Sequence, residues 1–259
     1  TKCYEEPFYS LSPIYNISQL IAENNTTVIL NGLGADELFA GYSYYRWANS
    51  WPLIKIISPL LQILTPFLGY FGQRVQTISK AGSVDRLYSL ATSKMMEKEK
   101  QNIFCKDSVE GLDSIEYLHN QYIGDHIKFS DPIEAFSYMD MKNYTGNHFV
   151  YRVDQCTMNF SLEGRIPFLD HELVELAFRI PSKYKISNGE GKWVVKEVAK
   201  KYIHPSNIEM KKKGFGLPIE KWMRGPIKEF VYESMNKLAN RDFINPEAIN
   251  KCRQNFSKG

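Results

Sequence analysis

Apolar and polar positions change pattern most sharply near residue 26 of the 259-residue chain. Residues 27–30, with the sequence TVIL, are apolar and β-branched, which predicts a buried strand. Gly32 and Gly34 follow, and residues 35–39 have the pattern of a first helical turn. We therefore predict a strand, a glycine turn and a helix over residues 26–42. This arrangement can present backbone N–H groups to an anion.

Most of the remaining pattern is helical. Asp170 is placed to cap a helix that turns its apolar residues toward a core, namely Leu173, Val174, Leu176 and Ala177. A second helix is predicted from about Lys192 to Tyr202, ending before the His204-Pro205 pair. Residues 43–150 favour helices with polar connections, and no other strand is convincing. The pattern thus predicts a mainly helical chain without internal repeats.

One apolar segment is long enough to cross a bilayer. Residues 51–71 read WPLIKIISPLLQILTPFLGYF. Lys55, Gln62 and three prolines, Pro52, Pro59 and Pro66, argue against a spanning helix, because repeated prolines interrupt one. We expect short soluble helices or an apolar surface patch, with contact to a membrane surface as the alternative.

Composition narrows the class of protein. The chain has 32 basic and 29 acidic residues, a formal charge of +3, and 43% hydrophobic residues, as in an ordinary soluble globular protein. So small a surplus of positive charge does not indicate a nucleic-acid partner. The four cysteines contain no CxxC pair, which favours reduced thiols in a cytoplasmic protein. The chain starts at Thr1 without a leader, and we expect it to be part of a longer gene product.

The glycine turn carries the sharpest chemical signal. Asp36 and Glu37 open the predicted helix just past the two glycines. One interpretation is helix-end stabilisation, which is worth about 0.3–1 kcal/mol. The other is a carboxylate that holds Mg²⁺ on a polyphosphate, since hard oxygen ligands suit that ion.

Basic residues form two further candidates. Lys211, Lys212 and Lys213 precede Gly214-Phe215-Gly216 and could steady a phosphate or an anionic transition state, although a solvated loop has the same pattern. Lys192, Lys196 and Lys200 recur every four residues, which favours a solvated helix face over a binding stripe.

Glu163 and Arg165 lie in an otherwise apolar run, where a lone charge is costly. They either pair as structure or line a site, and the sequence leaves both open.

These motifs together resemble the synthetase domain of glutamine-hydrolysing asparagine synthetases. Residues 31–42 (NGLGADELFAGY) are similar to that family's SGxGADELFGGY, residues 153–158 (VDQCTM) to VDRxSM, and residues 163–170 to ExRxPFLD. Residues 192–197 (KWVVKE) resemble a KxLLKE stretch, and residues 210–222 an RxKxGFGxPxxxW pattern. Glu6-Pro7-Phe8 is similar to the family's DEPF.

The resemblance implies a fold and a mechanism. The fold would be α/β, a partial doubly wound ATP-pyrophosphatase core of Rossmann-like type with a predominantly helical remainder. Residues 1–259 would form the C-terminal part of the synthetase domain, with a helical insertion over 43–150. A carboxylate would attack the α-phosphate of ATP, pyrophosphate would leave with Mg²⁺, and glutamine-derived ammonia would displace AMP to give an amide.

The resemblance also assigns site residues. Asn31 and Gly32 would contact the nucleotide, Asp36 would help to hold Mg²⁺-pyrophosphate, and Lys212 would stabilise developing charge. Glu37 is a second candidate catalytic residue. Candidate substrate-site residues are Glu163, Arg165 and Lys196.

Departures from the family pattern leave the acceptor open. The family's SGGxDS loop and glutaminase domain are not in this sequence. We expect a glutaminase domain upstream in the same gene product or acting in trans, and a homodimer is a further candidate.

Leu33 and Gln155 stand where asparagine-forming members often carry an acid and a basic residue, which leaves room for a carboxylate other than aspartate. The alternatives are an adenylating ligase of natural-product or surface-polysaccharide biosynthesis, and a non-catalytic interaction protein that retains the fold.

Overall fold

The computed structural model describes residues 11–64, 78–79, 81–93, 95, 97–111, 113–124, 127–208, 210 and 217–258. The chain divides into two compact units. The first contains Thr1–Ala91 and His119–Phe215, and the second contains Thr92–Leu118 and Gly216–Gly259.

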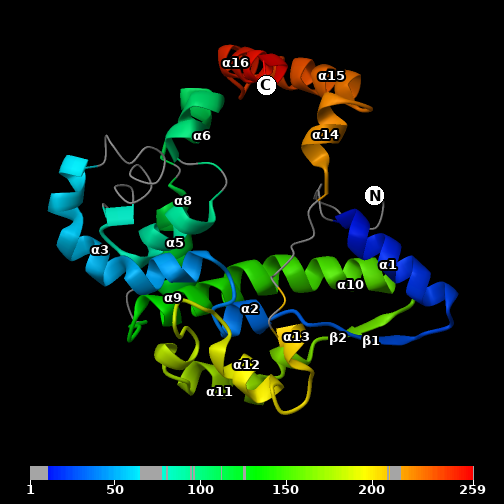
Figure 1. Ribbon diagram of the computed structural model, residues 1–259. Helices are drawn as coiled ribbons and strands as arrows, with labels where there is room; N and C mark the ends of the chain where they lie inside the picture. Colours follow the sequence, from blue (N-terminus) through cyan, green and yellow to red (C-terminus); the bar gives the residue numbers. More distant parts are fainter. Residues whose placement is uncertain are drawn as a thin grey trace. The chain divides into compact units, whose positions relative to one another are not determined.

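The first unit contains a small parallel sheet. Strand β1 (Val28–Leu30) pairs with β2 (Glu163–Arg165), with Ile29 opposite Gly164. The ladder is extended at both ends, because Thr27 O accepts from Glu163 N and Arg165 O accepts from Asn31 N, both at 2.8 Å. Figure 1 shows the two arrows side by side. The strand over residues 27–30 is confirmed, and β2 is a strand that the sequence pattern did not reveal.

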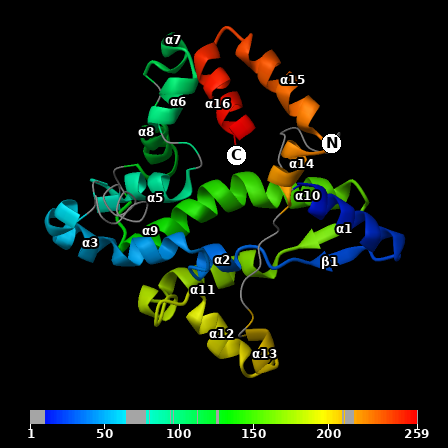
Figure 2. The ribbon, with the colours of Figure 1, turned by 45° about the horizontal axis from the view of Figure 1, so that its top comes forward.

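Helices α1 (Leu11–Glu23) and α10 (Tyr151–Met158) pack against each other in the same unit. Leu11 meets the buried Cys156, and the rings of Tyr15 and Phe160 lie edge to face at 4.8 Å. Helix α10 also covers one face of the sheet. A Cβ at Gly164 would lie 3.4 Å from Thr157 Oγ1, so the helix and β2 are in van der Waals contact. Both views show α1 alongside α10 (Figure 2).

The other face of the sheet exposes apolar side chains. Val28 is 39% exposed and Leu30 is 75% exposed. The prediction of a buried strand is therefore wrong for these two residues. The composition of the strand is right for burial, because parallel strands are normally covered on both faces, but the described residues do not bury this face.

A long helical segment runs beside the sheet and changes pitch midway. Helix α9 (Pro132–Met139) begins at Asp131, whose carboxylate accepts from the N–H groups of Ile133 and Glu134. The π-helix η3 (Asp140–Val150) follows directly and leads into α10. A π-helix of this length is unusual, since most are single-turn bulges.

The core of the first unit gathers around α2 (Ala35–Leu38). Leu38 and Phe39 are buried with Ala177 of α11 (His171–Arg179), and Val194 and Val195 of α12 (Trp193–Ala199) pack around them. The Asp170 cap is confirmed, since its carboxylate accepts from the N–H groups of Glu172 and Leu173. Leu176 is 52% exposed, so its prediction as a core residue is wrong.

Helix α3 (Tyr44–Leu64) corrects the interpretation of the apolar segment. Pro52 and Pro59 lie inside this single helix, whereas short interrupted helices were expected. A proline removes only one backbone donor, so a helix can continue past it when its other hydrogen bonds remain. Pro66 lies outside the described residues. Within the described part of the chain, no helix combines the length and apolar character needed to cross a membrane.

The remaining helices of the first unit whose bounds the structure describes are α5, of nine residues, and four helices of three to five residues. They are α5 (Val84–Thr92), η2 (His119–Ile123), η4 (Pro167–Leu169), η5 (Ser182–Tyr184) and α13 (Pro205–Ile208).

The second unit is helical. Residues Phe104 and Ile244 form an isolated antiparallel bridge, and Arg224 donates to the main-chain oxygen of Phe256 at 2.7 Å. The helices are α6 (Glu97–Ile103), α7 (Lys106–Val109), α8 (Ser114–Leu118), α14 (Ile219–Arg224), α15 (Lys228–Ala239) and α16 (Pro246–Lys258).

Close backbone contact at Gly191 leads to a stability prediction. A Cβ at this position would clash with the main-chain oxygen of Ala40, and neither backbone can give way as a flexible side chain could. We expect Gly191→Ala to lower the free energy of unfolding by about 1–3 kcal/mol, as overpacking usually does. Gly82→Ala is the control, because no atom of the described part of the chain lies within 4 Å of a Cβ placed there. Urea denaturation measures both, and an equal loss in the two variants would contradict the prediction.

Candidate functional site

The loop that leaves β1 lies at the carboxyl ends of both strands. Asn31 Oδ1 accepts a hydrogen bond from Leu33 N at 3.0 Å, which closes a tight turn. Among the residues that the structure describes, no atom lies within 4 Å of a Cβ placed at Gly32. Ligands of open α/β sheets bind outside the carboxyl ends of the strands. The two residues that the resemblance assigns to nucleotide binding therefore lie at the carboxyl end of the sheet.

Gly34 sets the direction of α2. Its φ of 88° is in the left-handed region, which favours glycine, and a Cβ would lie 3.3 Å from that of Phe168. The backbone can therefore turn sharply while staying against η4. The turn directs the two acidic residues of α2 to different surroundings.

Asp36 lies on the solvent side of α2 and faces a lysine. Its carboxylate forms an ion pair with Lys192 Nζ at 2.9 Å, and the two side chains are 22% and 28% exposed. Gly41 allows the approach, because a Cβ there would clash with the Asp36 carboxylate and the Lys192 side chain. Lys192 N also donates to Phe39 O at 2.8 Å. The main chain around Phe39 and the main chain of Lys192 thus hold the two charged residues next to each other.

Glu37 points inward. The residue is 1% exposed, and Tyr42 donates its hydroxyl to the carboxylate at 2.6 Å. Burial raises the pKa of Glu37, an effect that the hydrogen bond from Tyr42 partly offsets. The Glu37 carboxylate therefore contacts the interior of the protein, whereas the Asp36 carboxylate remains partly exposed to solvent.

A second buried carboxylate receives three phenol hydroxyls. Asp140, the first residue of η3, accepts from Tyr44 at 2.7 Å and from Tyr45 at 2.6 Å on Oδ2, and from Tyr88 at 2.7 Å on Oδ1. The Phe136 ring packs against Tyr88 at 5.2 Å. Burial raises the pKa of Asp140 to about 6, although the three hydrogen bonds lower it.

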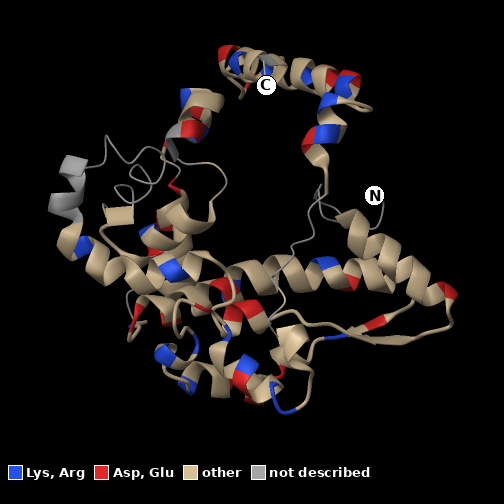
Figure 3. Cartoon of the chain, in the orientation of Figure 1, with Lys and Arg blue, Asp and Glu red and all other residues tan. Residues whose placement is uncertain are grey.

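The other predicted site residues form ion pairs of their own. Arg165 Nε donates to Glu163 at 2.8 Å, and both side chains are more than half exposed. Their hydrogen bond lowers the pKa of Glu163. Lys196 binds Glu190 at 2.7 Å. Figure 3 shows basic and acidic residues interspersed on α12, as on a solvated helix.

The structure therefore joins some predicted residues and separates others. Asn31, Gly32 and Asp36 follow β1 within a few residues, and Arg165 is bonded to Asn31 through the backbone. Lys196 lies on α12, one turn beyond Lys192. Lys212, the predicted catalytic lysine, lies outside the described residues, as do Glu6-Pro7-Phe8.

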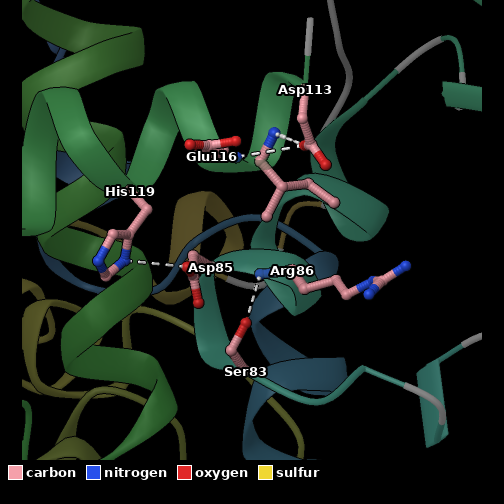
Figure 4. Close-up of polar contacts among 7 residues, drawn as sticks. Ser83, Asp85, Arg86, Asp113, Glu116 and His119 are labelled. Atoms are coloured by element: carbon pink, nitrogen blue, oxygen red, sulfur yellow. Dashed lines mark hydrogen bonds and ion pairs between the residues drawn. The ribbon is translucent and has the colours of Figure 1, made fainter. Parts of the chain in front are cut away.

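Two further ionisable groups lie away from this loop. Lys185 is 1% exposed with its ammonium group 5.3 Å from the Phe178 ring, and burial lowers the pKa of this lysine to about 8. His119 Nδ1 lies 3.1 Å from Asp85 Oδ2 (Figure 4). Among the described residues, no group of three or more His, Cys, Asp or Glu side chains is arranged to hold a metal ion.

Sequence reasoning missed the groups that hold α2. Lys192 was placed on a solvated helix face, yet it is the partner of Asp36. Asp140 and Tyr45, 95 positions apart, gave no pairing signal, because a long sequence separation carries none. The tyrosine-rich stretch at residues 42–45 was the available hint, since buried phenols usually find an acceptor.

Comparison with known proteins gives a consistent result. A family model described as asparagine synthase matches residues 1–258. An asparagine synthetase [glutamine-hydrolyzing] 1 of Bacillus subtilis is 28% identical and covers 92% of this chain. A putative asparagine synthetase [glutamine-hydrolyzing] of Mycobacterium bovis is 26% identical and covers 93%. No solved structure matches the chain.

Proteins with another name are also similar. Amidase chyE of Penicillium rubens is 23% identical and covers 85% of this chain. The chain spans 38% of the Bacillus relative, 37% of the Mycobacterium relative and 36% of the Penicillium relative. The similarity thus concerns a part of longer proteins.

The buried carboxyl group of Asp140 leads us to predict that stability depends on pH. Its pKa is about 6 in the folded chain against an ordinary 3.8, so between these values the folded state keeps a proton that the unfolded chain has released. The free energy of unfolding should fall as the pH rises through this window. For a shift of about two pKa units the fall is about 3 kcal/mol.

The measurement is urea denaturation between pH 4 and pH 7 of the natural protein and the Asp140→Asn variant. Subtracting the two curves removes the contributions of groups that do not interact with Asp140, whereas the part due to its electrostatic interaction with Glu37 remains in the difference. A flat difference across the window would contradict the prediction.

Proposed function

The chain belongs to the asparagine synthase family, and from this premise we propose that it forms the synthetase part of an ATP-dependent amide ligase. The proposed reaction has two steps. An acceptor carboxylate attacks the α-phosphorus of ATP and pyrophosphate leaves. Ammonia derived from glutamine then attacks the acyl carbon of the adenylate, and AMP leaves. Each step breaks one bond to phosphorus or carbon and forms another at the same atom.

The Asp36–Lys192 pair is the observation that carries this proposal. It places a carboxylate and an ammonium group 2.9 Å apart just beyond the carboxyl end of β1, next to the Asn31-Gly32 turn. A nucleotide that leaves pyrophosphate needs a fixed cation near its phosphates and a ligand for the accompanying metal. The pair supplies one of each at the sheet edge where ligands bind.

The residues present fit a magnesium ion. Mg²⁺ is usually held by one or two carboxylates together with substrate phosphates, and Asp36 offers a partly exposed carboxylate. Such an ion neutralises the phosphate charge that develops as pyrophosphate leaves. Asp36 would hold it, and Lys192 would then be released from Asp36 to face the phosphate oxygens. Lys212, by the family resemblance, would add a second cation.

One residue of the turn bears on the choice of acceptor. Leu33 stands in the turn at a position where the resemblance leads us to expect an acid in asparagine-forming members. An apolar side chain there offers no charge to the aspartate amino group. We therefore propose a carboxylate other than aspartate as a second candidate acceptor.

We further propose that additional chain completes the sheet. Val28 and Leu30 are exposed on one face, and the chain spans 38% of its Bacillus relative. More strands and helices would cover this face and form the doubly wound core, including the phosphate-binding loop that the family resemblance implies. The glutaminase domain would be the source of ammonia.

The function is tested with full-length protein that contains this chain. ATP, Mg²⁺, glutamine and a panel of carboxylates should give pyrophosphate and AMP in equal amounts only when the correct acceptor is present. Asp36→Asn should lower this rate by about 10²–10³, the usual cost of losing one transition-state stabilising group. Glu175→Gln is the control, because this exposed carboxylate pairs with Arg179 on α11.

Three other results would redirect the proposal. Release of ammonia from an amide without consumption of ATP would indicate an amidase. Complete inactivity with every acceptor would favour a non-catalytic interaction protein. Equal activity of Asp36→Asn and the natural protein would remove the metal-binding role of Asp36.

Lys212 is expected to stand out among its neighbours. A cation that faces charge only in the transition state changes the rate more than the fold, so Lys212→Ala should lower kcat by about 10²–10³. Lys211→Ala and Lys213→Ala should cost far less, since the resemblance assigns a role at the developing charge to Lys212 alone of the three, and most substitutions away from such roles have small effects. Pyrophosphate release is the measurement, at matched melting temperatures. Equal losses in all three variants would mean that the lysines act as a diffuse basic patch.

A further inference from the structure

The Tyr45 hydroxyl connects two elements that are distant in sequence. It lies 2.6 Å from Asp140 Oδ2 and 3.0 Å from the main-chain oxygen of Glu37. The first acceptor belongs to η3 and the second to α2. The Tyr45 side chain is completely buried, with its ring 5.9 Å from that of Phe136. One phenol therefore bridges α2 to the long helical segment.

Contacts from outside determine where α2 lies. The helix has four residues, and a single turn of helix is unstable by itself because few of its backbone groups are paired. On one side Leu38 and Phe39 pack in the core with Ala177. On the other side two tyrosines hold Glu37. The Tyr42 hydroxyl contacts the Glu37 carboxylate, and the Tyr45 hydroxyl contacts the Glu37 main-chain oxygen.

Asp36 is the neighbour of Glu37 on this one turn, and its position follows that of the Glu37 backbone. We propose that Tyr45 is a positioning residue, which holds α2 against Asp140 and thereby keeps the Asp36 carboxylate in place for the metal-bound phosphates. The inference rests on the proposed function of Asp36. Tyr45 does not touch the substrate and acts only through α2.

Tyr44 provides a matched control within the same helix. Its hydroxyl donates to the same oxygen, Asp140 Oδ2, at 2.7 Å. Phenylalanine at either position retains the ring, and the two rings stack at 5.1 Å. Both substitutions remove one donor from Asp140. The single hydroxyl proton of Tyr45 is shared between Asp140 Oδ2 and the Glu37 carbonyl, so the substitution at Tyr45 also removes the contact to Glu37.

The first experiment titrates Mg²⁺ in the pyrophosphate-release assay of full-length protein at saturating ATP. Tyr45→Phe should raise the Mg²⁺ concentration for half-maximal rate by about tenfold, the effect of losing about one hydrogen bond. Tyr44→Phe should stay close to the natural protein, and the KM for the acceptor should not change in either variant. Equal Mg²⁺ shifts in the two variants would overturn the inference, because loss of any donor to Asp140 would then suffice.

The second experiment needs no activity. Hydrogen–deuterium exchange of residues 36–41 reports on α2 directly, since Gly41 N donates to Asp36 O at 2.7 Å in this segment. Exchange should be faster in Tyr45→Phe than in Tyr44→Phe, and equal rates would overturn the inference. If the natural protein releases no pyrophosphate, the proposed function fails and exchange alone decides the role of Tyr45. Loss of the fold in Tyr45→Phe but not in Tyr44→Phe would also overturn a positioning role, because Tyr45 would then be part of the fold itself.

Discussion

The hydrogen bond from Tyr42 to the buried Glu37 carboxylate orients the single turn of α2, and the candidate site depends on that orientation. Successive residues of a helix point about 100° apart. Glu37 is turned into the interior together with Ala35 and Leu38, and Asp36, on the remaining side of the turn, meets Lys192 at 2.9 Å. Burial of the other three residues of the turn thus leaves Asp36 as its partly exposed residue. The buried Glu37 carboxylate holds the turn, and the partly exposed Asp36 carboxylate of the same turn faces the candidate site.

Burying acids in this way is costly unless their oxygens are paired. Asp140 meets the requirement with three phenol hydroxyls from α3 and α5, and burial still raises its pKa to about 6. Phenols suit the role because they donate a hydrogen bond without adding a positive charge. Their rings also pack against Phe136, so the same residues satisfy the carboxylate and fill the core.

Close approach of two backbones brings the surface partners together. Gly41 lies against the Asp36 carboxylate, and Gly191 lies against the main chain of Ala40. Side chains at these positions would push residues 190–192 away from α2. The Asp36–Lys192 pair therefore depends on two glycines as well as on the two charges. One of them, Gly191, precedes Lys192 directly, which explains why the turn before α12 carries the lysine to α2.

Local chemistry determined the elements that need only neighbouring residues. The β-branched run at residues 27–30 specifies a strand, and Asp170 specifies a helix start, because propensity and capping act over a few positions. The family motifs likewise identified the turn at Asn31 and the acid at Asp36. Pairing over long separations was decided by the tertiary structure. The strand at residues 163–165, the contact of Lys192 with Asp36 and the bridge from Tyr45 to Asp140 each join distant segments. Only packing tells which buried acid meets which donor, since the energy of such a contact depends on the surroundings that desolvate it.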